Sequence, residues 1–223
     1  MNVLLFDIDG TLLYTGGSGM AALRLAFEEV FGQTAPETVN TAGRTDRAIA
    51  GDFFRSCAVE DSFENWQRFC EAYVGHLAEQ LPLRDGYLLP GVDRCLETMA
   101  GRSDVAMGIL TGNVFEGARL KLEHLGIYDY FRFGGFGGDH RERTGVAKDA
   151  LAAARDAVDG EFALDRVWVI GDTPNDVRCA RSIGANAVAV ATGVNEKSDL
   201  ADESPDLLLD DLRQAGQLLD LLI

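Results

Sequence analysis

Two aspartates near the amino terminus, Asp7 and Asp9, are separated by one residue and directly follow an apolar run. That run, residues 3–6, is typical of a strand buried on both faces in the middle of a parallel sheet. Ligands of α/β sheets gather at the carboxyl ends of such strands. Alternate residues of an extended chain point to the same side, so the two carboxylates can converge on one bound group. The pattern favours catalysis over its structural alternative, a solvated acidic turn.

Two later apolar runs also end in polar signatures. The first run, residues 105–110, is followed by Thr111, Gly112 and Asn113 at the start of an expected helix. There a hydroxyl and backbone N–H groups can bind a phosphate. The structural alternative for Thr111 is an ordinary helix cap. The second run leads into Asp172, a natural third carboxylate, and Asp176, which can also serve as a cap in the first helical turn.

The segment between the first strand and about residue 90 has helical apolar spacing, over residues 20–31, 44–57 and 63–81, and no convincing strand. It is entered through Gly16-Gly17 and left near Leu89-Pro90-Gly91. We therefore predict a helical cap domain, residues 14–90, on flexible connectors that let it open and close over the acids.

The rest of the chain alternates strands and helices, which predicts an α/β fold with a Rossmann-like, doubly wound parallel sheet. We assign residues 1–13 and 91–223 to this catalytic core, with the all-helical cap inserted in it. The expected strands are 105–110, 132–136, 167–170, 187–191 and 206–209. The expected helices begin near 91, 114, 145, 174 and 212, and end near 100, 125, 158, 184 and 222.

In this order and at these separations, the three signatures resemble those of the haloacid dehalogenase superfamily of phosphotransferases. The resemblance covers the whole chain, and the helical insertion resembles the cap of the branch containing phosphoglycolate phosphatase and β-phosphoglucomutase. It implies that Asp7 is nucleophile and metal ligand, that Asp9 gives its backbone carbonyl to the metal, and that Asp172 completes the protein ligands. Asp176 is then an outer or additional metal ligand.

Simple electrostatics points to a cation at the same place. A carboxylate attacking a phosphate faces a repulsion of about 4 kcal/mol per pair of charges near 4 Å at an effective dielectric of 20. A hard divalent cation held by carboxylates, typically Mg²⁺, cancels this repulsion and binds phosphate. The free carboxyl group of Asp9 is well placed to protonate the leaving alcohol and then to deprotonate the hydrolytic water.

The family also uses a lysine that pairs with the nucleophile and the phosphate. This sequence departs from the usual Lys-Pro form of that motif. Arg143 lies at about the expected distance before the next apolar helix, and its guanidinium can bind phosphate through two N–H groups. Lys148 is the alternative, although it lies further into that helix. In the cap, Gly43-Arg44-Thr45-Asp46 resembles the segment that reaches the substrate in related enzymes, and Arg44 could bind an anionic or hydroxylated leaving group. The structural alternative for Arg44 is a surface residue at a helix start.

Composition limits the partners. The 223 residues carry a formal charge of −16, the wrong sign for gripping nucleic acid or an anionic membrane. The four cysteines form no C-x-x-C pair, and the four apolar residues before Asp7 are too few for a signal peptide. We expect a cytoplasmic enzyme that acts on a small phosphorylated metabolite, as a monomer or homodimer.

We therefore predict a Mg²⁺-dependent phosphatase that works through an aspartyl-phosphate, on phosphoglycolate or a sugar phosphate. A phosphomutase of the β-phosphoglucomutase type would use the same core residues, so it stays open. A dehalogenase would not need Asp9 as an acid. Phosphonoacetaldehyde hydrolysis needs a cap lysine, yet the first lysine of the chain is Lys121, outside the cap. A non-catalytic module that binds Mg²⁺ and phosphate is the rival from another class.

Overall fold

The structure, a computed structural model, describes residues 1–36, 39–158 and 161–222. Within these ranges six strands form one parallel sheet in the order β5-β4-β1-β6-β7-β8. The strands are β1 (Asn2–Phe6), β4 (Val105–Leu110), β5 (Gly134–Gly135), β6 (Val167–Gly171), β7 (Asn186–Val190) and β8 (Leu207–Leu209). The first strand thus lies in the middle of the sheet, as its continuous apolar run predicts.

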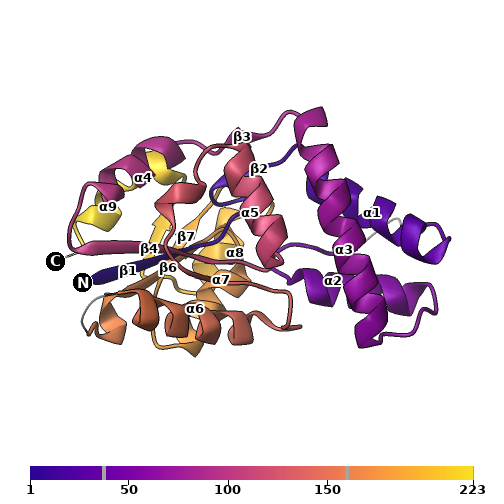
Figure 1. Ribbon diagram of the computed structural model, residues 1–223. Helices are drawn as coiled ribbons and strands as arrows, with labels where there is room; N and C mark the ends of the chain where they lie inside the picture. The colour runs from indigo at the N-terminus through magenta and orange to yellow at the C-terminus, as the bar shows by residue number, and fades with distance from the viewer. Residues whose placement is uncertain (37–38, 159–160, 223) are drawn as a thin grey trace.

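Helices cover both faces of this sheet (Figure 1). Leu4 and Phe6 of β1 pack in one hydrophobic cluster, whereas Val3 and Leu5 pack in the other. The first cluster includes residues of α4 (Val92–Ala100), α5 (Phe115–His124) and α9 (Gly216–Leu219), and the second includes residues of α6 (Arg143–Ala157), α7 (Pro174–Ser182) and α8 (Lys197–Asp202). The predicted fold class, a doubly wound α/β core, is confirmed.

Three helices form a separate cap beside the core: α1 (Ser18–Phe31), α2 (Asp46–Ser56) and α3 (Phe63–Gln80). They share a third hydrophobic cluster, in which Phe27 of α1 contacts Phe53 and Phe69 in edge-on or tilted ring pairs. Val114, which precedes α5 in the core, also belongs to this cluster. The cap therefore has its own apolar centre and packs on the core at the start of α5.

The connectors between core and cap pair with each other as a two-stranded antiparallel ribbon. Strand β2 (Leu13–Tyr14) pairs with β3 (Tyr87–Leu88), in a region where the sequence predicts no strand. Two residues are too few to show an alternating pattern, and their partners are far apart in the sequence. The ribbon ties the entry and exit of the cap together at one edge of the core.

Some element boundaries differ from the predicted ones. Of the expected strand 132–136 only Gly134–Gly135 forms β5, although Arg132 and Phe133 also hydrogen-bond through their backbones to β4. The short helix α8 is not among the expected elements. The expected carboxyl-terminal helix is replaced by a 3₁₀ turn, Leu212–Gln214, and the short α9. Leu212 and Leu218 are both buried in the core, so tertiary packing explains the apolar character of this segment without a continuous helix.

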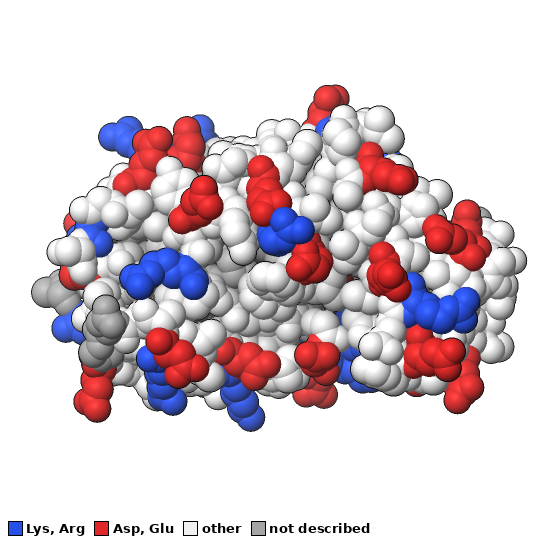
Figure 2. Space-filling view, viewed as in Figure 1, with Lys and Arg blue, Asp and Glu red and all other residues white. Residues whose placement is uncertain are grey.

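Charged side chains are scattered over the surface. On the face shown in Figure 2, Asp and Glu side chains lie over both core and cap, with Lys and Arg between them. This distribution fits a chain with a net charge of −16. In the part of the chain that the structure describes, no helix has both the length and the apolar character that crossing a bilayer requires.

Candidate active site

The three signatures meet at the carboxyl edge of the sheet. Strand β1 pairs with β4 on one side and with β6 on the other, so Asp7, Thr111 and Asp172 follow three neighbouring strands. The Asp7 N–H donates to Ile170 O at 2.9 Å, which holds the turn after β1 against the end of β6. Local strand patterns and parallel pairing together therefore bring these polar residues to one place.

Asp7, Asp172 and Asp176 form a buried acidic cluster. Each offers a carboxylate oxygen, and these oxygens lie within 4.8 Å of one another. Burial, with the charge of Asp176 and that of Asp9, raises the pKa of Asp7 to about 6, although Arg143 opposes the shift. Burial and the charges of Asp176 and Asp7 likewise raise the pKa of Asp172 well above its ordinary value. Three crowded hard oxygen donors fit a divalent cation such as Mg²⁺, whose charge would offset their repulsion.

The carboxylate of Asp176 already has protein partners. Its Oδ2 accepts hydrogen bonds from the Thr173 N–H at 3.0 Å and from the Thr173 hydroxyl at 2.7 Å. Its Oδ1 accepts from Nη2 of Arg143. Asp172 is less engaged, since Thr11 donates to its Oδ1 at 2.9 Å. Both carboxylate oxygens of Asp176 are therefore occupied by protein partners, and Asp176 caps α7. Asp7 and Asp172 instead line the cavity between core and cap.

The structure brings Arg143, and not Lys148, to the acidic cluster. Helix α6 begins at Arg143, two residues earlier than predicted, and its guanidinium is buried. Nη1 donates to Asp7 Oδ2 at 3.3 Å, and Nη2 donates to Leu110 O at 3.3 Å. Lys148 lies further along α6 with an exposed side chain. The guanidinium thus joins the ends of β1, β4 and β6.

The loop after β4 combines a hydroxyl with backbone amides. The Thr111 N–H donates to Gly135 O at 3.1 Å, and Thr111 is fully buried, whereas the following Gly112 and Asn113 line the cavity between core and cap. The Asn113 side chain donates to Thr111 Oγ1 at 2.9 Å and to Asp9 Oδ2 at 2.8 Å. Gly112 is required by close approach, because a Cβ there would lie 2.0 Å from Arg44 O of the cap.

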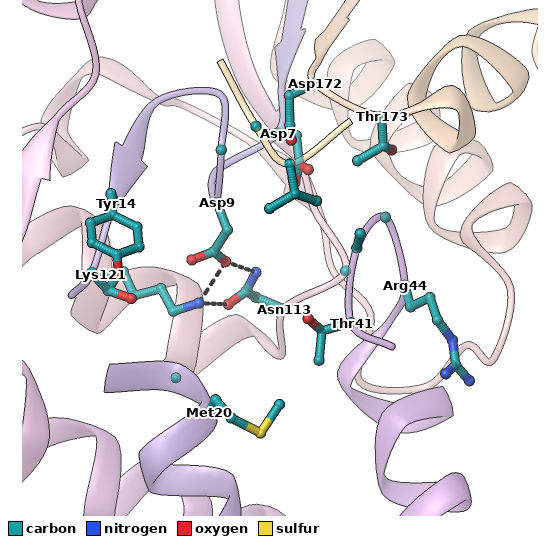
Figure 3. Close-up of a pocket in the computed structure, with 18 of the residues that line it drawn as sticks. Asp7, Asp9, Tyr14, Met20, Thr41, Arg44, Asn113, Lys121, Asp172 and Thr173 are labelled. Atoms are coloured by element: carbon teal, nitrogen blue, oxygen red, sulfur yellow. Dashed lines mark hydrogen bonds and ion pairs between the residues drawn. The ribbon is translucent and has the colours of Figure 1, made fainter. Parts of the chain in front are cut away.

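Asp9 has a second partner that the sequence reading missed. Nζ of Lys121, on α5, donates to Asp9 Oδ2 at 2.6 Å and to Asn113 Oδ1 at 2.5 Å (Figure 3). The signal was present: Lys121 occupies the buried face of α5, three residues after Ala118 and next to Leu122, where an apolar residue is expected.

The cap reaches the site through the segment before α2. The Asp46 N–H donates to Gly112 O at 2.7 Å, and Asp46 Oδ2 accepts from the Val114 N–H at 2.8 Å. Burial raises the pKa of Asp46 to about 6, an effect that Lys121 opposes. Asn175 also donates to Gly43 O at 2.9 Å. Asp46 belongs to the predicted segment 43–46, but the sequence predicts no role for its carboxylate, because its partners on the core are 66 or more positions away.

The side chain of Arg44 does not face the cavity. Its guanidinium pairs with Asp52 at 2.5 Å and donates to Asn40 O at 2.9 Å. Figure 3 shows it pointing away from Asp7 and Asp9. The predicted segment is thus in place, but its backbone and Asp46 contact the core, whereas the predicted side chain turns toward the cap surface.

Between core and cap lies a cavity of about 450 Å³. Its core side carries Asp7, Asp9, Asn113, Lys121 and Asp172. Its cap side and connectors add mostly apolar or aromatic residues: Tyr14, Met20, Leu23, Ile49, Tyr73, Tyr87 and Leu89. The size suits a small organic ligand whose polar end meets the strand ends.

Known proteins are similar to this chain in sequence and in fold. A family model described as haloacid dehalogenase-like hydrolase matches residues 4–190. Phosphoglycolate phosphatase of Synechococcus elongatus is 27% identical over 220 residues, covering 96% of this chain and 97% of that protein. The crystal structure of a protein described as "a predicted phosphoglycolate phosphatase" from Haemophilus somnus has a TM-score of 0.75 at 19% identity and covers 98% of both chains.

A further structure, CbbY from Rhodobacter sphaeroides in complex with phosphate, has a TM-score of 0.75 at 16% identity, covering 97% of this chain and 96% of that one. These structural likenesses support the fold, and the family match includes all three strand-end signatures. The predicted superfamily and its class of enzyme are confirmed. The chain belongs to the haloacid dehalogenase-like hydrolase family.

Proposed function

We propose that this hydrolase is a Mg²⁺-dependent phosphatase, which acts on a small phosphorylated metabolite through an aspartyl-phosphate at Asp7. The main support is the position of Asp7: its carboxylate lies between Asp172 and Arg143 and lines the cavity between core and cap. The phosphatase names of several relatives support the same reaction. Four free cysteines fit the cytoplasmic location that we propose.

The first half-reaction forms a bond between an Asp7 oxygen and phosphorus, while the ester P–O bond breaks and the leaving oxygen takes a proton from Asp9. In the second, Asp9 removes a proton from water, the water oxygen attacks phosphorus, and the bond to Asp7 breaks to release phosphate. Arg143, Thr111 and the amides of Gly112 and Asn113 would hold the transferring oxygens.

We propose that Asp7, Asp172 and the backbone carbonyl of Asp9 would hold Mg²⁺, with Asp176 behind them. The bound ion would offset the repulsion between the nucleophile and the phosphate. We also propose the domain boundaries 1–13 and 91–223 for the core and 14–90 for the cap. Cap opening about the β2–β3 ribbon would admit substrate, and closure would exclude water from the first step.

A panel of phosphate monoesters tests the function. With Mg²⁺, the protein should release phosphate from at least one of 2-phosphoglycolate, glucose 6-phosphate and p-nitrophenyl phosphate. Phosphate released from none of them would contradict the proposal. Interconversion of β-glucose 1-phosphate and glucose 6-phosphate without release of phosphate would instead identify the phosphomutase alternative.

Replacing Arg143 should separate the two candidates for the basic residue. Arg143→Met is expected to lower kcat/KM by about 100- to 1000-fold, since it removes charge-assisted hydrogen bonds at the transferring group. Arg143→Lys should retain more activity, because it keeps the charge but loses the paired N–H groups. Lys148→Met, on the exposed side of α6, is the matched control and should stay within about twofold of the parent. A large loss in Lys148→Met with an active Arg143→Met would reverse the assignment.

A further inference from the structure

Lys121 presents an unusual charge inside the cavity. Only 4% of the residue is exposed, yet it belongs to the cavity lining. Its ammonium group has three N–H donors, and Asp9 Oδ2 and Asn113 Oδ1 accept two of them. Among the residues that the structure describes, no acceptor takes the third. A buried cation therefore keeps one hydrogen-bond donor for a ligand.

The cap approaches this ammonium at the start of α1, where Gly19 and Met20 line the cavity. A Cβ at Gly19, in the first turn of α1, would lie 3.6 Å from Nζ of Lys121, so a side chain there would contact the ammonium. Met20, the next residue of α1, also lines the cavity and lies beneath Lys121 in Figure 3. The part of the cavity beside the ammonium is therefore bounded by the start of α1.

The other two cations of the cavity lining are committed elsewhere. Arg143 contacts Asp7 and Asp176 at the acidic cluster, where the phosphoryl group would bind. Arg44 pairs with Asp52 and points away. Lys121 instead donates to Oδ2 of Asp9, the residue that would contact the leaving oxygen. Its ammonium therefore lies beside the first atoms of the leaving group.

We propose that Lys121 selects the substrate by binding a carboxylate attached directly to the ester carbon of the leaving group. This inference rests on the proposed phosphatase function and narrows its substrate class to small phosphate esters of hydroxy acids. A carboxylate needs only the one remaining N–H for a charge-assisted hydrogen bond. A second phosphate would bring two charges beside Asp9 and Asp46, so it fits this position less well.

Two esters that differ only in this group test the inference. 2-Phosphoglycolate carries the carboxylate, and ethyl phosphate has a methyl group in its place. The parent should prefer 2-phosphoglycolate in kcat/KM by at least about tenfold. Lys121→Met should lower this preference by about 10- to 100-fold, the range for losing a hydrogen bond to a charged group, and Lys121→Arg should retain part of it. Lys148→Met is the control and should leave the preference unchanged.

The outcomes are distinct. If Lys121→Met lowers kcat/KM for both esters by the same factor, Lys121 only positions Asp9 and the inference is wrong. If the parent shows no preference, the inference is wrong without any variant, which also covers the case in which Lys121→Met does not fold. If the parent releases phosphate from neither ester but hydrolyses others, the substrate class fails while the phosphatase function stands. No hydrolysis of any ester would overturn the proposed function itself.

Discussion

Asp7→Asn is expected to lower kcat for every phosphate ester by about 10⁴-fold or more, the scale of losing a nucleophile. The amide keeps the shape of the side chain, but it cannot form the acyl phosphate. Phosphate release under saturating substrate and Mg²⁺ measures the effect. Acid quenching during turnover should also trap phosphate on the parent protein and not on the variant. Equal rates in the two proteins would rule out Asp7 as the nucleophile.

The same substitution should not unfold the protein. Burial raises the pKa of Asp7 to about 6, above its value of about 3.9 in an unfolded chain. The folded state therefore binds more protons between these values, and its stability falls as the pH rises from about 4 through 6. Asparagine does not ionise, so Asp7→Asn removes this loss of stability. Without Mg²⁺ at pH 7, Asp7→Asn should unfold at the same or a higher temperature than the parent, so its inactivity would be chemical.

Removing Mg²⁺ should have the second large effect. Chelation with EDTA is expected to lower phosphate release by at least about 100-fold, because the crowded acids then repel the phosphate. Added Mg²⁺ should restore activity. A rate that is unchanged by EDTA after extensive dialysis would show that the acidic cluster works without a cation.

Thermal unfolding gives a readout of the metal that does not depend on activity. At Mg²⁺ concentrations of about 100 times Kd, binding should stabilise the folded state by about 2.7 kcal/mol, which raises Tm by about 5–10 °C for a chain of this size. Asp172→Asn should abolish most of this shift, since it removes a proposed ligand. Asp93→Asn, an exposed change on α4, should retain the shift. The same shift in Asp172→Asn would place the ion elsewhere.

The positions of Asp7, Thr111 and Asp172 could be predicted because each depends on a local pattern. An apolar run marks a buried strand, and the residue after it lies at the carboxyl edge. Parallel pairing of β4, β1 and β6 then brings three such edges together. The alternation of strands with helices also made the fold class predictable.

The contacts of Lys121, Asp46 and Arg44 around these strand-end residues were not predictable in this way. Lys121 looks like one charge on a helix until α5 is packed against the core, and Asp46 looks like a helix start until the cap meets Gly112 and Val114. For Arg44 the sequence predicts a contact with the substrate that the structure does not show. Its guanidinium pairs with Asp52 and points away from the cavity. Such contacts depend on side-chain directions between elements far apart in the sequence.

The sequence by itself therefore determined the sheet, the inserted cap, and the residues at the strand ends, because backbone periodicity places them whatever the packing details. Only the tertiary structure decided which charges face the cavity and which are neutralised outside it. The physical reason is that desolvation and ion pairing act over a few ångströms between folded surfaces. The buried contact of the Lys121 ammonium with Asp9 and Asn113, for example, exists only once α5 has packed against the ends of β1 and β4.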